Sequence, residues 1–185
     1  MTRLRVATFN VENLGKAGVP DASLDERIRL LRPQLLRLRA DVLCLQEVDS
    51  RRLEPGGPRQ LEALDALLET TPYASFQRAS THSRSRGDFR DKHNLVVCSR
   101  FPIVNRQQVL HELVAPPSYR PLHGKAETDG RVRNQSIEWD RPILHVALDI
   151  GHASPLHVVV VHLRAPRAAF VEGQKASAQT WRRMQ

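Results

Sequence analysis

The first third of the chain shows strand-like and helix-like patterns of apolar residues in turn. Apolar and β-branched residues dominate positions 4–11, which predicts a strand. Apolar residues then recur at helical spacing, at Leu24, Ile28, Leu31, Leu35 and Leu38. Pro33 lies inside this pattern, so we expect a kink in the helix or a shifted start. A continuous apolar run within residues 41–47 is typical of a strand covered on both faces.

A strand, a helix and a second strand form a βαβ unit, in which the crossover is right-handed and the two strands run parallel. Parallel strands end at the same edge of a sheet, and α/β proteins usually build their sites at this carboxyl edge. Asn10 lies at the end of the first strand and Glu47 at the end of the second. We therefore expect the side chains of these two residues to meet.

The rest of the chain is richer in strands than in helices. A second helix is predicted around Leu61, Leu64 and Leu68, and a terminal helix over residues 168–184. Further strands are predicted over residues 73–78, 93–99, 103–113, 141–148 and 156–162. Residues 80–92 form an Arg-rich loop, and the polar residues 116–134 a long excursion or lid. Because short turns join the later strands, we predict one α/β (α+β) sandwich domain over residues 1–185.

The composition, 41% hydrophobic and 26% charged over 185 residues, is that of a soluble globular protein with one sizeable core. No apolar run is long enough for a secretion signal or a membrane span, which favours a cytoplasmic location. Cys44 and Cys98 lie in apolar runs, and a disulfide framework needs more cysteines than two. We expect both to be inert core thiols.

A formal net charge of +8 favours a phosphate-bearing partner, because a positive surface attracts anions. However, 24 of the 28 basic residues are Arg, a bias that genomic base composition also produces. Nucleic acid is therefore one partner that the charge permits, and the charge alone does not select it.

Asn10 and Glu47 offer oxygen ligands of the kind that Mg²⁺ or Mn²⁺ prefers, with the rest of the ion's shell filled by water and substrate phosphate. A structural explanation is also open. In that case Asn10 forms an Asx turn at the end of its strand, and Glu47 only marks the end of the next one.

Two sequence motifs contain Asn10 and Glu47. Residues 8–13, TFNVEN, and residues 41–48, DVLCLQEV, resemble the two N-terminal signatures of the endonuclease/exonuclease/phosphatase superfamily. That superfamily includes apurinic endonucleases, DNase I-like nucleases, sphingomyelinases and inositol phosphatases. The resemblance implies a DNase I-like α/β/β/α sandwich, with Asn10 and Glu47 as ligands of the divalent metal.

Two later segments are similar to the same superfamily. Residues 93–103, HNLVVCSRFPI, resemble its middle strand, which serves as scaffold. Residues 158–164, VVVVHLR, resemble the strand whose terminal histidine faces the phosphate, which implies a catalytic role for His162. An imidazole there could donate a hydrogen bond or charge to the non-bridging oxygens as negative charge develops. A half-buried imidazole without such a role is the alternative.

Superfamily members often place a variable substrate loop where this chain has residues 84–91. Arg84, Arg86 and Arg90 would then clamp phosphates, and we assign Asn94 to the same substrate site. A solvated basic loop is an equally simple interpretation. Asp88 and Asp91 are weaker candidates for additional metal ligands.

Zinc chemistry is disfavoured, because the chain has no H-E-x-x-H motif. His157 and His162 are five residues apart on a predicted strand and so lie on opposite faces. Trp139 and Trp181 are interpreted as core or interface anchors rather than as base-stacking platforms.

Two later signatures of the superfamily, Gly-Asp-Phe/Leu-Asn and Ser-Asp-His, do not occur before the chain ends at Gln185. We therefore expect an incomplete sandwich that is impaired in catalysis and self-associates through exposed strand edges. The leading hypothesis is a metal-dependent phosphoesterase, with nuclease activity as one form of it. The alternative is a non-catalytic member that binds metal or nucleic acid.

Overall fold

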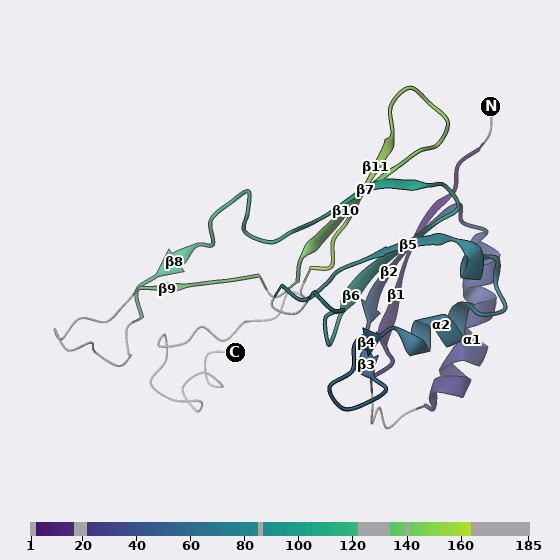
Figure 1. Ribbon diagram of the computed structural model, residues 1–185, viewed down its shortest axis with the longest axis horizontal. Coiled ribbons are helices and arrows are strands. Elements are labelled where there is room, and N and C mark those ends of the chain that lie inside the picture. Colours follow the sequence, from purple (N-terminus) through teal and green to yellow (C-terminus); the bar gives the residue numbers. More distant parts are fainter. Residues whose placement is uncertain (1–2, 17–21, 85–86, 122–133, 140, 164–185) are drawn as a thin grey trace, which may run out of the picture. The chain divides into compact units, whose positions relative to one another are not determined.

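The computed structural model describes residues 3–16, 22–84, 87–121, 134–139 and 141–163 (Figure 1). The predicted helix over residues 168–184, Arg86 and Trp181 lie outside the described residues. Backbone contacts divide the chain into two units, Met1–Val109 with Arg141–His162 and Leu110–Asp140 with Leu163–Gln185. The single domain expected over residues 1–185 stays a prediction.

The first unit contains a four-stranded sheet in the order β1-β2-β6-β5. Its strands are β1 (Val6–Leu14), β2 (Val42–Val48), β5 (Gln77–Ser80) and β6 (Asn94–Ser99). β1 and β2 pair in parallel, as the βαβ pattern predicts, and the other neighbours pair antiparallel. β2 and β6 are almost completely buried, which explains their continuous apolar sequences.

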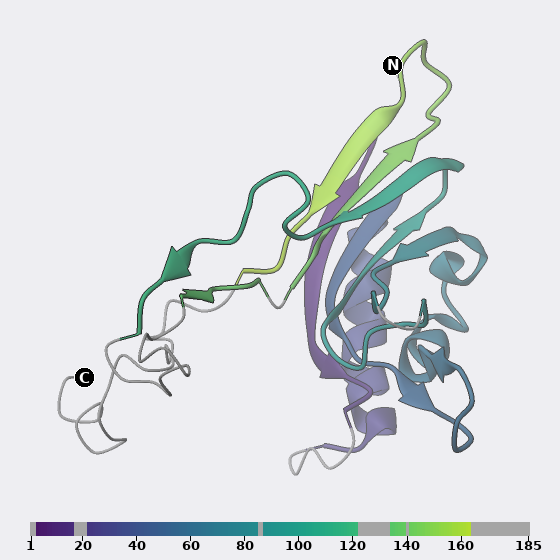
Figure 2. The ribbon, with the colours of Figure 1, turned by 60° about the vertical axis from the view of Figure 1, so that its left-hand side comes forward.

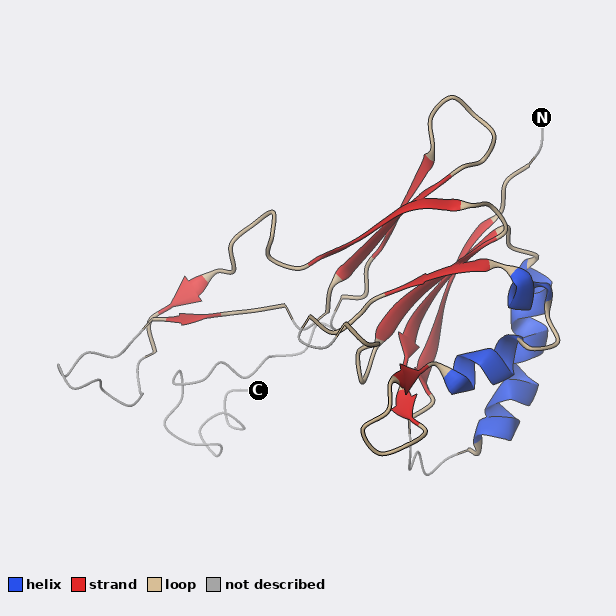
Figure 3. Ribbon diagram, in the orientation of Figure 1, coloured by secondary structure: helices blue, strands red, loops and turns tan. Residues whose placement is uncertain are grey.

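Two helices, α1 (Leu24–Leu38) and α2 (Glu62–Leu68), cover one face of this sheet (Figure 3). α1 begins with a capping box, in which Ser23 and Glu26 satisfy each other's backbone N–H groups. Pro33 lies inside α1 and does not end it. Pro33 and Arg29 are both exposed, so water can bind the carbonyl that lacks a partner. The apolar faces of both helices and the sheet share one core, which includes Leu35, Leu43 and Leu64.

A second, three-stranded sheet contains β7 (Ile103–Val109), β10 (Ile143–Leu148) and β11 (Leu156–Val160) in the order β11-β10-β7, all antiparallel. Alternate residues of β10 and β11 join a core with residues of the first sheet; Leu144 and Val160 thus lie with Val97. The two sheets therefore pack face to face (Figure 2). The outer helical layer of an α/β/β/α sandwich stays a prediction.

The strand predicted over residues 73–78 is wrong in its first half. Residues Pro72–Ser75 form a 3-10 helix, and β5 begins only at Gln77. Pro72 favours the first turn of this helix, and the Thr71 side chain accepts from the N–H of Tyr73. The Tyr73 hydroxyl then donates to the carbonyl of Leu35 at 2.9 Å. Tyr73 thus ties this turn to α1.

Four short strands complete the described structure. In the first unit β3 (Arg51–Arg52) pairs with β4 (Arg59–Gln60). In the second unit β8 (Ser118–Tyr119) pairs with β9 (Gln135–Ser136), at the two ends of the polar excursion. None of the helices in the described ranges is long and apolar enough to cross a membrane.

Candidate active site

The ends of β1 and β2 bring Asn10 and Glu47 together, as predicted from the sequence. Asn10 Nδ2 donates to Glu47 Oε1 at 3.2 Å, and the backbone N–H of Asn13 donates to Glu47 Oε2 at 3.1 Å. Both strands lose regular register here, between Asn10 and Leu14 and between Leu45 and Val48. Glu47 has a φ of 63°, in the left-handed region that non-glycine residues seldom adopt. Such irregularities re-aim side chains next to sites and are retained there despite their cost.

Asn10 also forms the Asx turn that its structural explanation anticipated. Its Oδ1 accepts from the N–H of Glu12 at 2.8 Å. The guanidinium of Arg27, on α1, donates to the carbonyls of Val11 and Glu12, each at 2.6 Å. The turn is therefore held from both sides, and the amide of Asn10 stays directed at Glu47.

His162 follows β11 and completes this arrangement from the second sheet. Its Nε2 lies 3.2 Å from Glu47 Oε1 and 3.5 Å from Asn10 Nδ2. The side chains of His162 and Glu47 are 14% and 15% exposed. All three residues assigned to the catalytic and metal site thus meet in one cluster, in which Asn10 is exposed and the other two side chains are largely buried, although His162 is separated from Asn10 by 152 positions.

Sequence reasoning missed two neighbours of His162. Arg141 Nη1 lies 3.1 Å from Nδ1 and 3.0 Å from Nε2 of the imidazole. The ring of His93 lies with its centroid 6.4 Å from that of His162. His93 directly precedes β6, which pairs with β2, and Arg141 lies just before β10, which pairs with β11. That position is the signal that could have identified them.

His93 is held in an unusual conformation. Its φ is 54°, and its backbone N–H donates to Asp49 Oδ1 at 2.8 Å. Its Nδ1 is buried and has no hydrogen-bond partner among the described residues. A buried polar atom without a partner costs free energy, so it marks a place where a ligand, ion or water completes the site. Burial, the largest cause, raises the pKa of the Asp49 carboxyl.

The residues assigned to substrate binding take different positions. Arg84 is exposed, Arg90 is half-buried, and Arg86 lies outside the described ranges. Asn94 is fully buried. Its Nδ2 donates to the carbonyls of Val48 at 2.9 Å and Arg90 at 2.7 Å, and its Oδ1 accepts from the N–H of Arg90 at 3.0 Å. Asn94 therefore supports the loop from inside, and direct contact of Asn94 with the substrate stays a prediction.

Neither aspartate of this loop lies beside Glu47 as an additional ligand. Asp88 pairs with Arg52 at 2.9 Å, and Asp91 pairs with Arg59 at 2.7 Å. The described part of the chain holds no group of three or more His, Cys, Asp or Glu residues that could bind a metal. Glu47 offers two carboxylate oxygens, and Asn10 offers Oδ1, which also accepts from the N–H of Glu12. One or two protein oxygens are what a hard cation such as Mg²⁺ commonly takes.

His157 lies apart from this cluster, as expected from its spacing to His162. Its Nδ1 is 2.9 Å from Nε2 of His145 on the neighbouring strand β10, and the two rings stack.

A family model describing the endonuclease/exonuclease/phosphatase family matches residues 7–173 of the chain. Members of this family hydrolyse phosphoester bonds and generally use divalent metals. No curated protein sequence matches the chain.

Several solved structures are similar to the chain. A family protein from Leptotrichia buccalis is 15% identical with a TM-score of 0.52, over 99% of this chain and 63% of that one. The mannosyl-6-phosphatase of Bacteroides thetaiotaomicron is 15% identical, with a TM-score of 0.51, over 85% of this chain and 50% of that one. The human Nocturnin catalytic domain, solved with a bound sulfate anion, is 17% identical with a TM-score of 0.51, over 88% and 50%.

At these identities the similarity shows the fold, and this chain spans less than two-thirds of the length of each of these chains. The match to the family model covers most of the sequence and includes Asn10, Glu47 and His162. The chain therefore belongs to the endonuclease/exonuclease/phosphatase family.

Proposed function

We propose that this protein is a phosphoesterase that depends on Mg²⁺ or Mn²⁺, with Glu47, Asn10 and His162 at its active site. The observation that carries the proposal is their convergence at the edge of the first sheet, with Glu47 Oε1 3.2 Å from both Asn10 Nδ2 and His162 Nε2. Hydrolysis of phosphoester bonds is the chemistry of the family, which supports the reaction type.

Glu47 and Asn10 are the residues that would hold the metal. The bound cation would supply Lewis-acid stabilisation of charge on the phosphoryl oxygens. His162 would donate a hydrogen bond to a non-bridging oxygen of the same phosphate, and its largely buried position strengthens such an interaction. Arg141 is placed to orient the His162 ring, since its Nη1 lies within 3.1 Å of both ring nitrogens.

His93 is a further candidate for contact with the substrate. Its buried Nδ1 lacks a partner among the described residues, and its ring faces His162. Arg84, Arg86 and Arg90 remain proposed phosphate clamps, because guanidinium groups bind phosphate oxygens in pairs. Nuclease or phosphodiesterase activity, a cytoplasmic location and self-association through strand edges remain predictions of the same hypothesis.

Substitution of the proposed metal ligand tests the function. Glu47→Gln removes the carboxylate and keeps the size of the side chain. We expect Mg²⁺- or Mn²⁺-dependent hydrolysis of bis-p-nitrophenyl phosphate to fall by at least about a hundredfold, since even residues that only support a metal ligand affect activity by up to that factor. Weaker Mn²⁺ binding, measured by electron paramagnetic resonance, should accompany this loss. Glu69→Gln, an exposed carboxylate after α2, is the matched control.

Two outcomes would count against the proposal. Unchanged Mn²⁺ affinity in Glu47→Gln would show that the metal binds elsewhere. Metal binding without turnover on any phosphoester would instead favour the alternative, a non-catalytic member that binds metal or nucleic acid.

A further inference from the structure

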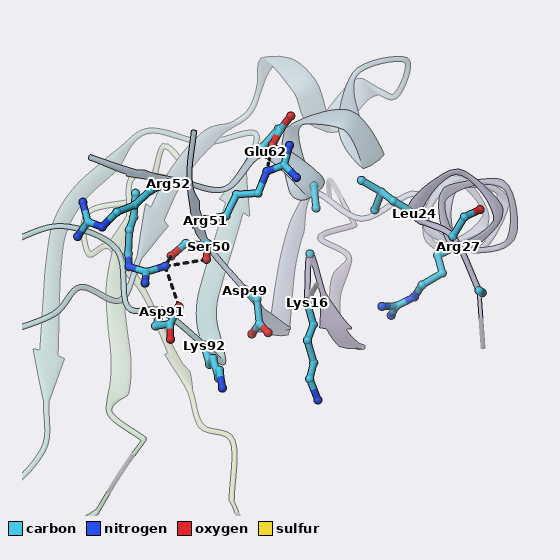
Figure 4. Close-up of a pocket in the computed structure, with 15 residues that line it drawn as sticks. Lys16, Leu24, Arg27, Asp49, Ser50, Arg51, Arg52, Glu62, Asp91 and Lys92 are labelled. Carbon is cyan, nitrogen blue, oxygen red and sulfur yellow. Dashed lines mark hydrogen bonds and ion pairs between the residues drawn. The ribbon is translucent and has the colours of Figure 1, made fainter. Parts of the chain in front are cut away.

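A cavity of about 640 Å³ lies beside the proposed active site (Figure 4). Its walls come from the segment after β1, the start of α1, the residues after β2, the β3–β4 pair, the start of α2 and the residues before β6. The charged residues that line it are Lys16, Arg27, Asp49, Arg51, Arg52, Arg59, Glu62, Asp91 and Lys92. Six of these side chains are cationic and three are anionic, so the cavity carries an excess of positive charge.

The arginines of the cavity are engaged in its walls. Arg51 pairs with Glu62, and Arg59 pairs with Asp91 at 2.7 Å. Arg27 is bound to the backbone carbonyls that follow β1. These contacts fix the shape of the cavity and neutralise part of its charge.

Lys16 and Lys92 differ from the arginines. Both are exposed, and neither ammonium group has a hydrogen bond or ion pair within the described ranges. In Figure 4 the two side chains extend in the same direction, on either side of Asp49. Ammonium groups on one side of a concave surface raise the local concentration of anions.

Asp49 lies between the two lysines and carries one negative charge against their two positive charges, so the group keeps a net positive charge. Its side chain is only 5% exposed, and its Oδ1 accepts from the backbone N–H of His93. In Figure 4 the carboxylate points the same way as the two lysine side chains, but it is almost completely buried, whereas both lysines are exposed.

The cavity and the active site share three chain segments. Lys16 is three residues after Asn13, Asp49 is two after Glu47, and Lys92 directly precedes His93. Two or three residues span at most about 7 to 11 Å. The cavity therefore begins within about this distance of the active site.

We propose that this cavity binds a second phosphate group of the substrate, held by Lys16 and Lys92 while the scissile phosphate lies at Glu47 and His162. The volume exceeds that of a phosphate and has apolar lining at Leu24 and Ala63, so it also accommodates the organic part that carries the phosphate. This inference rests on the proposed function and narrows its substrate class to esters with more than one phosphate. Both an oligonucleotide and a small bisphosphate have this chemistry.

The test measures binding without turnover, so it is independent of catalysis. Fluorescence anisotropy of a labelled single-stranded oligonucleotide is recorded in chelator, with a nucleoside 3′,5′-bisphosphate as competitor. The variant Lys16→Gln/Lys92→Gln is compared with wild type and with Arg29→Gln/Arg37→Gln, which removes two charges from the exposed face of α1. We expect the lysine variant to bind the oligonucleotide about tenfold more weakly, and its salt dependence to lose a slope of about 0.7, because one phosphate contact is lost.

The outcomes separate the two sources of the phosphate and the two hypotheses. If the bisphosphate competes with the oligonucleotide in wild type but not in the lysine variant, the cavity binds the second phosphate of a small molecule. If the lysine variant loses oligonucleotide binding and the bisphosphate does not compete in wild type, the cavity binds a phosphate of a nucleic-acid chain. If the lysine and control variants weaken binding equally, the cavity is not a phosphate site. No metal is present in this binding assay. Its result therefore does not depend on whether the Glu47→Gln prediction about metal binding and hydrolysis is correct.

Discussion

The substitution Asn94→Ala distinguishes two roles for Asn94, structural support of the loop at residues 84–91 and direct contact with the substrate. The Asn94 side chain is fully buried and makes three hydrogen bonds of 2.7 to 3.0 Å to the main chain of Val48 and Arg90. Each such bond contributes about 1 kcal/mol, and its loss costs more when the remaining partner stays buried. We therefore expect the free energy of unfolding to fall by about 3 to 4 kcal/mol.

A loss of this size corresponds to a Tm lower by about 10 °C for a chain of this length. Denaturant unfolding followed by circular dichroism measures the free energy, and hydrolysis at a temperature well below the Tm measures activity per folded molecule. Arg84→Ala is the control, because Arg84 is exposed in the same loop. It should leave stability within about 0.5 kcal/mol of wild type and raise KM. An Asn94→Ala protein of wild-type stability with a raised KM would refute the supporting role and restore direct substrate contact.

Three further predictions concern other parts of the molecule. Arg141→Gln should lower kcat/KM by about tenfold, because Arg141 Nη1 lies within 3.1 Å of both ring nitrogens of His162; an unchanged kcat/KM would contradict this role. Burial raises the pKa of Cys44 to about 11 and of Cys98 to about 12. Iodoacetamide at pH 8 should therefore label both thiols at least about a hundredfold faster in denatured than in folded protein, and the labelling rate of the folded protein should rise with pH. Rapid labelling of the folded protein at pH 8 would disprove this. Val159→Lys places a charge on a side chain that is 60% exposed on β11, the outermost strand of the second sheet within the described ranges, and should reduce concentration-dependent association in light scattering; a wild-type protein that stays monomeric at all concentrations would exclude the association.

Local patterns in the sequence were sufficient for the βαβ unit at the start of the fold. Helical spacing and the capping residues Ser23 and Glu26 define α1, and a buried apolar run defines β2. Since the crossover has one hand, these elements already imply parallel strands that end side by side. The meeting of Asn10 with Glu47 follows from this rule, and the family motifs added the expectation for His162.

The rest of the site depends on contacts between segments that are distant in the sequence. His162 reaches Glu47 only because β11 pairs with β10 and the second sheet packs on the first. Irregular register at the ends of β1 and β2 decides where side chains point, and no periodic pattern encodes it.

The positions of His93, Arg141 and Asn94 also depend on tertiary structure. A left-handed backbone turns His93 toward His162, and Arg141 approaches the same ring from the start of β10. Asn94 lies within the motif at residues 93–103, and packing buries its side chain completely. The sequence by itself determined the βαβ unit and the residue types at the carboxyl ends of its two strands. Only the tertiary structure decided which of them face the site, because burial and hydrogen-bond partners arise from packing between distant segments.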